Sequence, residues 1–159
     1  MTKSVIVFLL GVLVGAAVLG LVVRDQALSR MFVEDVSVFD FDATVQSIQD
    51  EAVVAGWQIP AVHTISQSVA KAGIEILPVT IIELCKAPIA GKVLGSEEGR
   101  RIAPMMPCRV AVFQNDQGEV IVSRMNSPLL SRLFGGIIEE VMSQAAAENE
   151  EIFATTLGH

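Results

Sequence analysis

Apolar residues form one unbroken run near the start of the chain and shorter periodic patterns after it. From Val5 to Val23 there is no charged residue and no Asn, Gln, Ser, Thr or Pro. As a helix this run would span roughly 28 Å, about the hydrocarbon thickness of a bilayer. A cleaved signal peptide is the alternative, but its apolar region is usually only about 7–15 residues long. The pattern therefore predicts a transmembrane anchor over residues 1–23 and a short polar stalk over 24–30.

After the stalk, the pattern becomes that of one globular domain over residues 31–159. Partly alternating apolar residues predict a strand over 31–39, and Asp40 is a suitable N-cap for a helix directly after it. Up to Gly56, a residue type common at helix C-terminal ends, this helix has one apolar stripe at helical spacing. The stripe consists of Phe41, Val45, Ile48, Ala52 and Ala55.

Four further strands and a long helix complete the predicted domain. We expect the strands over 57–65, 74–85, 108–114 and 119–125, with a hairpin turn between the last two. Short helical segments connect them, and helical spacing returns from Gly136 onward. The order strand, helix, four strands, helix favours an α+β fold with an antiparallel sheet and helices on one face.

The charge balance excludes one class of partner. Beyond Val23 the chain has ten basic and eighteen acidic side chains, a net charge of −8. Because an acidic domain repels phosphate backbones, we expect no nucleic-acid partner. Counting Lys and Arg alone on the two sides of the apolar run favours a cytoplasmic domain. A short basic N-terminal tail, here Lys3, before an apolar run is however typical of a signal anchor that exports the domain after it. We therefore expect the domain to be extracytoplasmic.

Several stretches of the domain resemble a known family. They are FDFDATVQSIQDEAVVAGW, ILPVTIIELCKAPIA, MMPCRVAVFQNDQGEVIVSRMN and LFGGIIEEVM, which cover most of residues 35–145. The chain is similar to the domain of unknown function 302 family, in its subgroup with an N-terminal membrane anchor. The resemblance implies a curved antiparallel sheet with a long C-terminal helix and no settled activity. Lys86-Ala87-Pro88 departs from the family, which more often has Asn-Pro directly after the cysteine.

The two cysteines are the first candidates for chemistry. Glu83 and Cys85 lie two apart on a predicted strand, so their side chains share a face, and Cys108 begins another strand. With His63 and Met125 they would offer sulfur and imidazole ligands, which suit copper(I), zinc or haem iron. Two alternatives remain open: a disulfide or redox pair, and two plain buried thiols.

Glu83 is a second candidate. A carboxylate in an otherwise apolar strand is costly unless it is paired or protonated. Arg109 and Arg124 are the candidate partners for an ion pair. The alternative is a carboxyl whose pKa is tuned for acid or base chemistry.

The sequence shows no complete catalytic arrangement. It has no G-x-S-x-G, Walker or dinucleotide-binding pattern, and no Cys and His spacing typical of zinc sites. The sequence therefore favours a membrane-tethered binding or accessory domain over an enzyme. The alternative is a redox domain, or one that handles a metal or haem, through Cys85 and Cys108.

Small residues in the predicted anchor suggest self-association. Gly11 and Gly15 form a GxxxG pattern, and Ala16 and Gly20 repeat the same spacing. This spacing lets two helix backbones approach closely within a bilayer. It predicts a homodimer, although glycine is also simply frequent in transmembrane helices.

Overall fold

The computed structural model of the chain describes residues 11, 13–15, 19, 20 and 29–158. The chain forms two compact units, Met1–Phe32 and Val33–His159. Most of the predicted anchor over 1–23 and of the stalk over 24–30 lies outside the described residues, so both remain predictions. Among the residues that the structure describes, none of the helices combines the length and the apolar character needed to span a bilayer.

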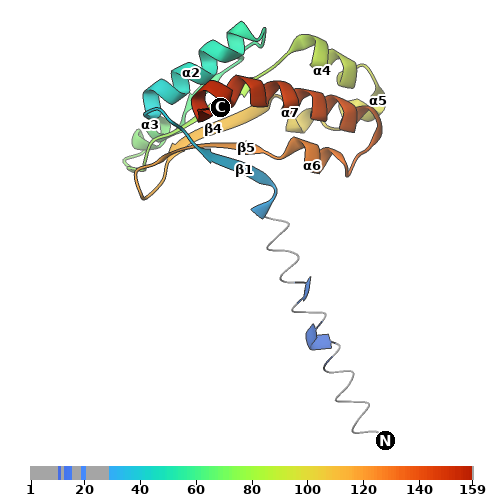
Figure 1. Cartoon of the computed structure of the whole chain (residues 1–159), viewed down its shortest axis with the longest axis horizontal. Coiled ribbons are helices and arrows are strands. Elements are labelled where there is room, and N and C mark those ends of the chain that lie inside the picture. The colour runs from blue at the N-terminus through green and yellow to red at the C-terminus, as the bar shows by residue number, and fades with distance from the viewer. Residues whose placement is uncertain (1–10, 12, 16–18, 21–28, 159) are drawn as a thin grey trace, which may run out of the picture. The chain divides into compact units, whose positions relative to one another are not determined.

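The second unit is built on a five-stranded sheet with the order β1-β5-β4-β3-β2 (Figure 1). Its neighbours β2 and β3, β3 and β4, and β4 and β5 pair antiparallel. With the helices that accompany it, the sheet makes the domain an α+β fold, as the order of elements predicted. The strands are β1 (Phe32–Val36), β2 (Val62–Thr64), β3 (Val79–Leu84), β4 (Cys108–Gln114) and β5 (Val120–Met125).

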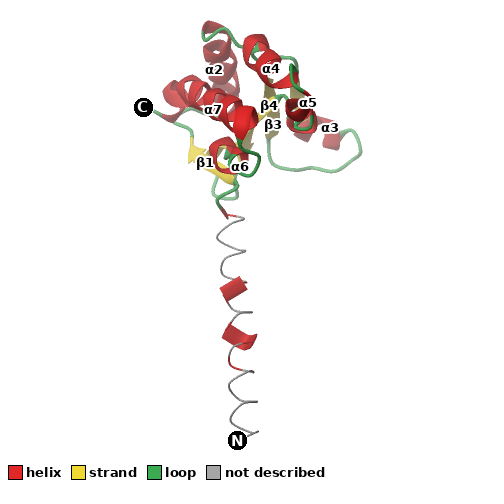
Figure 2. Cartoon of the chain, turned by 90° about the vertical axis from the view of Figure 1, so that its right-hand side faces the viewer, coloured by secondary structure: helices red, strands yellow, loops and turns green. Residues whose placement is uncertain are grey.

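The longest helices, α2 and α7, lie side by side against the sheet (Figure 2). Asp40 caps α2, because its Oδ1 accepts a hydrogen bond of 2.9 Å from the Ala43 N–H. The α-helices are α2 (Phe41–Val54), α3 (Ile65–Ala70), α4 (Ala87–Leu94), α5 (Glu97–Arg100), α6 (Ser127–Ser131) and α7 (Gly136–Leu157), with a 3-10 helix at Ala103–Met105.

Three strands are shorter than the sequence predicted by more than one residue. β1 covers Phe32–Val36 of the predicted 31–39, and β2 and β3 are shortened next to a proline. β3 begins at Val79, because Pro78 cannot donate to a sheet ladder, and residues 74–78 form a loop instead of the first half of a strand. β2 keeps three residues of the predicted 57–65, with Pro60 interrupting the segment. The helix α6 was not predicted. It begins with a proline in its first turn and is capped by the Asn126 side chain.

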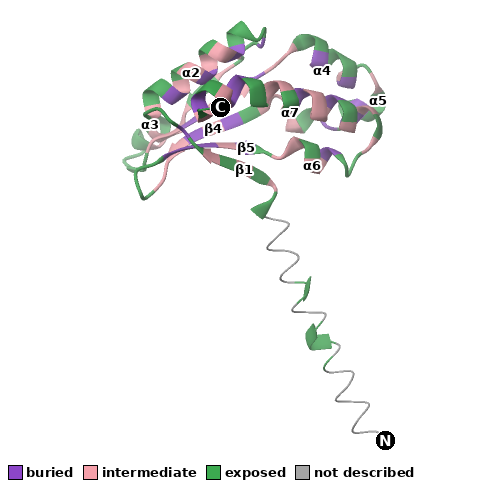
Figure 3. Cartoon of the chain, in the orientation of Figure 1, coloured by how far each residue is buried: buried purple, intermediate pink, exposed green. Residues whose placement is uncertain are grey.

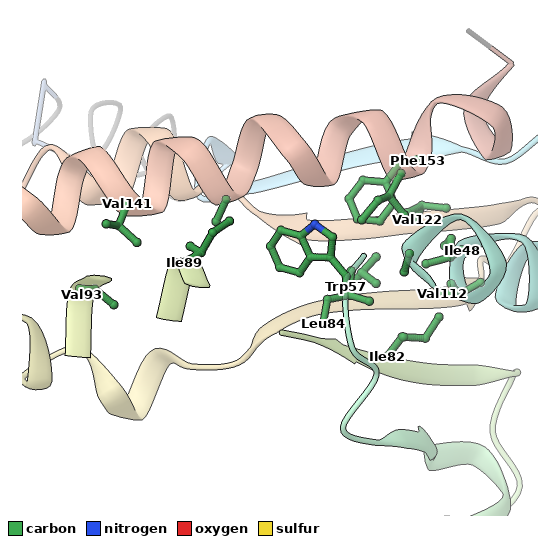
Figure 4. Close-up of a cluster of buried hydrophobic side chains, with 14 of the residues drawn as sticks. Ile48, Trp57, Ile82, Leu84, Ile89, Val93, Val112, Val122, Val141 and Phe153 are labelled. Carbon is green, nitrogen blue, oxygen red and sulfur yellow. The ribbon is translucent and has the colours of Figure 1, made fainter. Parts of the chain in front are cut away.

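One hydrophobic core fills the space between the sheet and the helices α2, α4 and α7 (Figure 3). Strand residues alternate in burial, and those facing the helices belong to the core. Figure 4 shows Trp57 between α7 and the sheet, with Leu84 and Phe153 near it. Burying each large side chain of this kind contributes roughly 1.5–3 kcal/mol to stability.

The other face of the sheet carries none of the core cluster. Its central apolar residues are Val79 and Ile81 on β3, Phe113 on β4 and Ile121 on β5. Polar side chains stand beside them. We call the set of Glu34, Val36, His63, Val79, Ile81, Glu83, Arg109, Ala111, Phe113, Ile121 and Ser123 the outer face.

Candidate functional site

Cys108 points toward the helices. It is the first residue of β4 and pairs with Leu84 of β3, and residues directly opposite each other in an antiparallel pair share a face. Leu84 is buried in the core, and Cys108 packs against the same cluster. Burial raises the pKa of the Cys108 thiol, and a charge on Cys85 adds to the rise, while a hydrogen bond from Asn149 opposes it. The thiol is therefore held in its neutral form.

Cys85 follows Leu84 and forms an isolated antiparallel bridge with Gln58. It borders the cavity of about 60 Å³ beneath α7, as do Trp57 and Ile89. The next residue, Lys86, donates from its ammonium to Glu148 on α7, with 2.7 Å between Nζ and Oε2.

The two cysteines are neighbours on adjacent segments of the sheet. Both border one cavity of about 60 Å³ beneath α7, and both are free.

Glu83 pairs with Arg109 and His63 on the outer face. Its Oε1 accepts hydrogen bonds from Arg109 Nε at 3.2 Å and Nη2 at 3.0 Å, and lies 3.2 Å from His63 Nε2. The hydrogen bond with His63, followed by that with Arg109, lowers the pKa of Glu83 against the opposing effect of burial. A lowered pKa keeps the carboxylate charged at neutral pH. Of the two interpretations of Glu83, this geometry is that of an ion pair.

Arg124, the second candidate partner, is held by two other carboxylates. Its side chain is 9% exposed and binds Glu150 through Nε at 2.7 Å and Nη2 at 2.5 Å, and Asp35 through Nη1 at 2.7 Å. The guanidinium also lies over the Phe153 ring, 5.2 Å from its centre. Burial lowers the pKa of Arg124, but the hydrogen bonds with Glu150 and Asp35 outweigh burial and the net shift is upward.

A larger cavity of about 240 Å³ lies where β4 begins, β5 ends and α7 passes over them. Its wall is largely apolar, and Arg109 and Glu150 supply charged groups that are 62% and 53% exposed. Inside it, Asn149 has a buried Oδ1 without a hydrogen-bond partner among the described residues. Cys108, Met105 and Leu84 border both cavities.

The five candidate metal ligands do not converge. Cys108 and Met125 line the larger cavity, and Cys85 borders the smaller one, whereas His63 and Glu83 lie together on the outer face. Within residues 29–158 and the short described stretches before them, no group of three or more His, Cys, Asp or Glu side chains could hold a metal ion.

Two ion pairs made by the C-terminal half of α7 were not predicted from the sequence. Glu148 binds Lys86, and Glu150 binds Arg124. Lys86 also lies over the Trp57 ring, 5.9 Å from its centre. One signal in the sequence could have indicated the Arg124 ion pairs. Arg124 is the single charged residue of the strand VIVSRM, and a charge in such a strand needs an acidic partner from another element.

Comparison with known proteins places the fold. No curated protein matches the chain. Among solved structures, an uncharacterized conserved protein DUF302 from Bacillus stearothermophilus superimposes with a TM-score of 0.71 at 14% identity. The match covers 79% of this chain and 98% of that one, and at this identity it shows the fold alone. The family model described as "Domain of unknown function DUF302" matches residues 34–156. The chain therefore belongs to the DUF302 domain family.

Proposed function

We propose that the chain is a membrane-tethered binding domain, in the membrane-anchored subgroup of its family, whose ligand occupies the cavity of about 240 Å³ beneath α7. The tether is supported by the uncharged run from Val5 to Val23. The cavity is the observation that carries binding, because ligand sites are typically apolar hollows with a few polar groups.

The wall of the cavity indicates what would fit. Met105, Cys108 and Phe153 provide apolar and polarizable contacts, and Arg109 and Glu150 provide one charge of each sign at exposed positions. Pockets for drug-sized molecules usually have volumes of about 300–1,000 Å³. The cavity of about 240 Å³ is smaller, so its ligand is smaller than a drug-sized molecule. We infer a small, mainly apolar molecule with one polar end.

Two neighbouring alanines on α7 provide a matched test. Ala146 lines the cavity, whereas Ala147 is exposed and does not. The full chain in detergent would be screened against small molecules by thermal shift. We expect ligands that stabilise the natural protein and the Ala147→Leu variant but not Ala146→Leu, whose side chain fills the cavity. Ligands that stabilise both variants equally would place the binding site elsewhere, and an absence of ligands would contradict the proposal.

A redox role, or one in metal or haem handling, is the second candidate. One observation favours it: Cys108 and Met105, a thiol and a thioether, border both cavities. Cys85 borders the smaller cavity as well. Metal analysis, a visible absorption spectrum and a thiol count on the purified full chain test this candidate. Two free thiols with no metal and no chromophore would rule it out.

A further inference from the structure

One row of outer-face side chains runs straight across the sheet. Ala111 on the central strand β4 pairs with Ser123 on β5 and with Ile81 on β3. Ile81 in turn pairs with His63 on β2. On the other side, Ser123 Oγ donates to Glu34 Oε1 on β1 at 3.2 Å. The row therefore has a carboxylate at one edge, an imidazole at the other edge and a small alanine at its centre.

The neighbouring row is apolar. Phe113 on β4 pairs with Ile121 on β5 and with Val79 on β3. None of the three belongs to the core cluster on the other side of the sheet. Phe113 and Val79 are partly exposed, as is Ile81 of the first row, whereas Ile121 is buried and β1 carries the exposed Val36. Apolar side chains gathered on a sheet face without a core behind them are typical of an interaction surface.

Charge indicates what kind of partner this surface accepts. The chain beyond Val23 has a net charge of −8, which makes two copies repel each other in general. The outer face is an exception, because Glu83 is paired with Arg109 and His63, leaving Glu34 as the other acid among its residues. Two acidic domains meet with little repulsion on such a face.

We propose that the outer face binds the outer face of a second copy of this chain, about a twofold axis that runs along β4. This axis exchanges β1 with β2 and β5 with β3 because β4 is the middle strand. Glu34 of each copy then faces His63 of the other, and this contact occurs twice, as in every twofold interface. Ala111 meets Ala111 of the second copy at the axis, and its small size allows packed sheets to approach to about 10 Å.

The interface is small. Four strand spacings of about 4.8 Å give a face roughly 19 Å wide, which is at the low end for a stable complex. Two domains anchored in the same membrane have a much higher effective concentration than in solution, and this compensates for weak contacts. The stability of the dimer in membranes therefore depends on the proposed tether. The contacts made across the outer face do not depend on it.

Site-directed cross-linking of the full chain tests the geometry. In a background of Cys85→Ser and Cys108→Ala, Ala111→Cys places a thiol at the axis. Because packed sheets lie about 10 Å apart, too far for a direct disulfide, a short bifunctional thiol reagent should give a covalent dimer. Ser123→Cys is the matched control. It lies in the same row, one strand away, where it faces Ile81 of the second copy and not its own counterpart. We expect several-fold more cross-linked dimer from Ala111→Cys than from Ser123→Cys, both in membranes and with concentrated chain in detergent.

The edge contacts provide a second variant set. In the double variant His63→Glu with Ala111→Cys, the new carboxylate at position 63 faces Glu34 of the second copy, and cross-linking should fall. Adding Glu34→Lys to this double variant replaces the repulsion by an attraction and should restore cross-linking. Equal cross-linking of Ala111→Cys and Ser123→Cys, or none from Ala111→Cys, would overturn the proposal and point to another partner. If Ala111→Cys cross-links in detergent but the chain is absent from membranes, the tether fails and the interface stands.

Discussion

Leu84 of β3 and Cys108 of β4 lie directly opposite each other, and this pairing places the Cys108 thiol on the helix side of the sheet. Cys85, one residue after Leu84, borders the same small cavity beneath α7 as Cys108. The two cysteines are therefore neighbours, and both are free.

The burial of Cys108 predicts unequal reactivity of the two thiols. Because burial raises the pKa of Cys108, its thiolate is scarce near neutral pH, and the thiolate is the reactive form. In the folded full chain we expect a thiol reagent to label Cys85 at once and Cys108 only after unfolding. Cys85→Ser should remove the fast phase and Cys108→Ser the slow one. Failure of both thiols to react in unfolded, unreduced protein would show a disulfide and contradict this arrangement.

The Glu83 ion pair predicts a contribution to acid stability. The pKa of Glu83 in the folded chain is below its ordinary value of 4.5. A lowered carboxyl pKa stabilises the fold above the unfolded value, and this stabilisation is lost as the pH falls through the folded value. Glu83→Gln should therefore flatten the decline in the free energy of unfolding below about pH 4.5. Glu75→Gln, at an exposed position in the loop before β3, is the control for replacing a carboxyl, and the flattening should be larger in Glu83→Gln.

The two arginine pairs should differ in their effect on stability. Arg124 is nearly buried and holds two carboxylates of distant elements, whereas Arg109 is mostly exposed. Because Asp35 and Glu150 are partly solvated, we expect Arg124→Met to lower the free energy of unfolding by about 1–3 kcal/mol. Arg109→Met should cost much less. Urea unfolding of the two variants checks this, and similar losses would show that the burial of Arg124 contributes little.

Local patterns predicted the elements that depend on neighbouring residues. The Asp40 cap, the β4–β5 hairpin and the long helix α7 are each determined by residues within a few positions of one another. The shortening of β3 also has a local cause, which is Pro78. This proline is visible in the sequence, but the sequence did not predict that residues 74–78 lie outside the sheet.

The candidate site depended on information that is not local. The sequence placed Cys85 at the end of one strand and Cys108 at the start of another, but the pairing of Leu84 with Cys108 decides which side the Cys108 thiol faces. The partners of Arg124 come from positions 35 and 150, at opposite ends of the domain. No pattern around residue 124 identifies them, because an ion pair requires only that tertiary packing brings the charges together.

Orientation in the membrane is a further prediction. Lys3 is the sole basic side chain before the apolar run, and we expect the domain to be exported. A fusion at the C-terminus to a reporter that is active only outside the cytoplasm should be active. A reporter that is active only inside the cytoplasm should be silent at the same position. The reverse result would place the domain in the cytoplasm, in agreement with the count of Lys and Arg.

Membrane fractionation tests the tether most directly. The full chain and a variant lacking residues 1–23 would be expressed side by side, and the membranes would be washed at alkaline pH, which releases peripheral proteins. We predict that the full chain stays in the washed membranes, because the run from Val5 to Val23 is long enough to span a bilayer. The shortened chain should be soluble and unfold cooperatively. A full chain released by the wash, or a shortened chain recovered only as aggregate, would contradict a folded domain held by a membrane anchor.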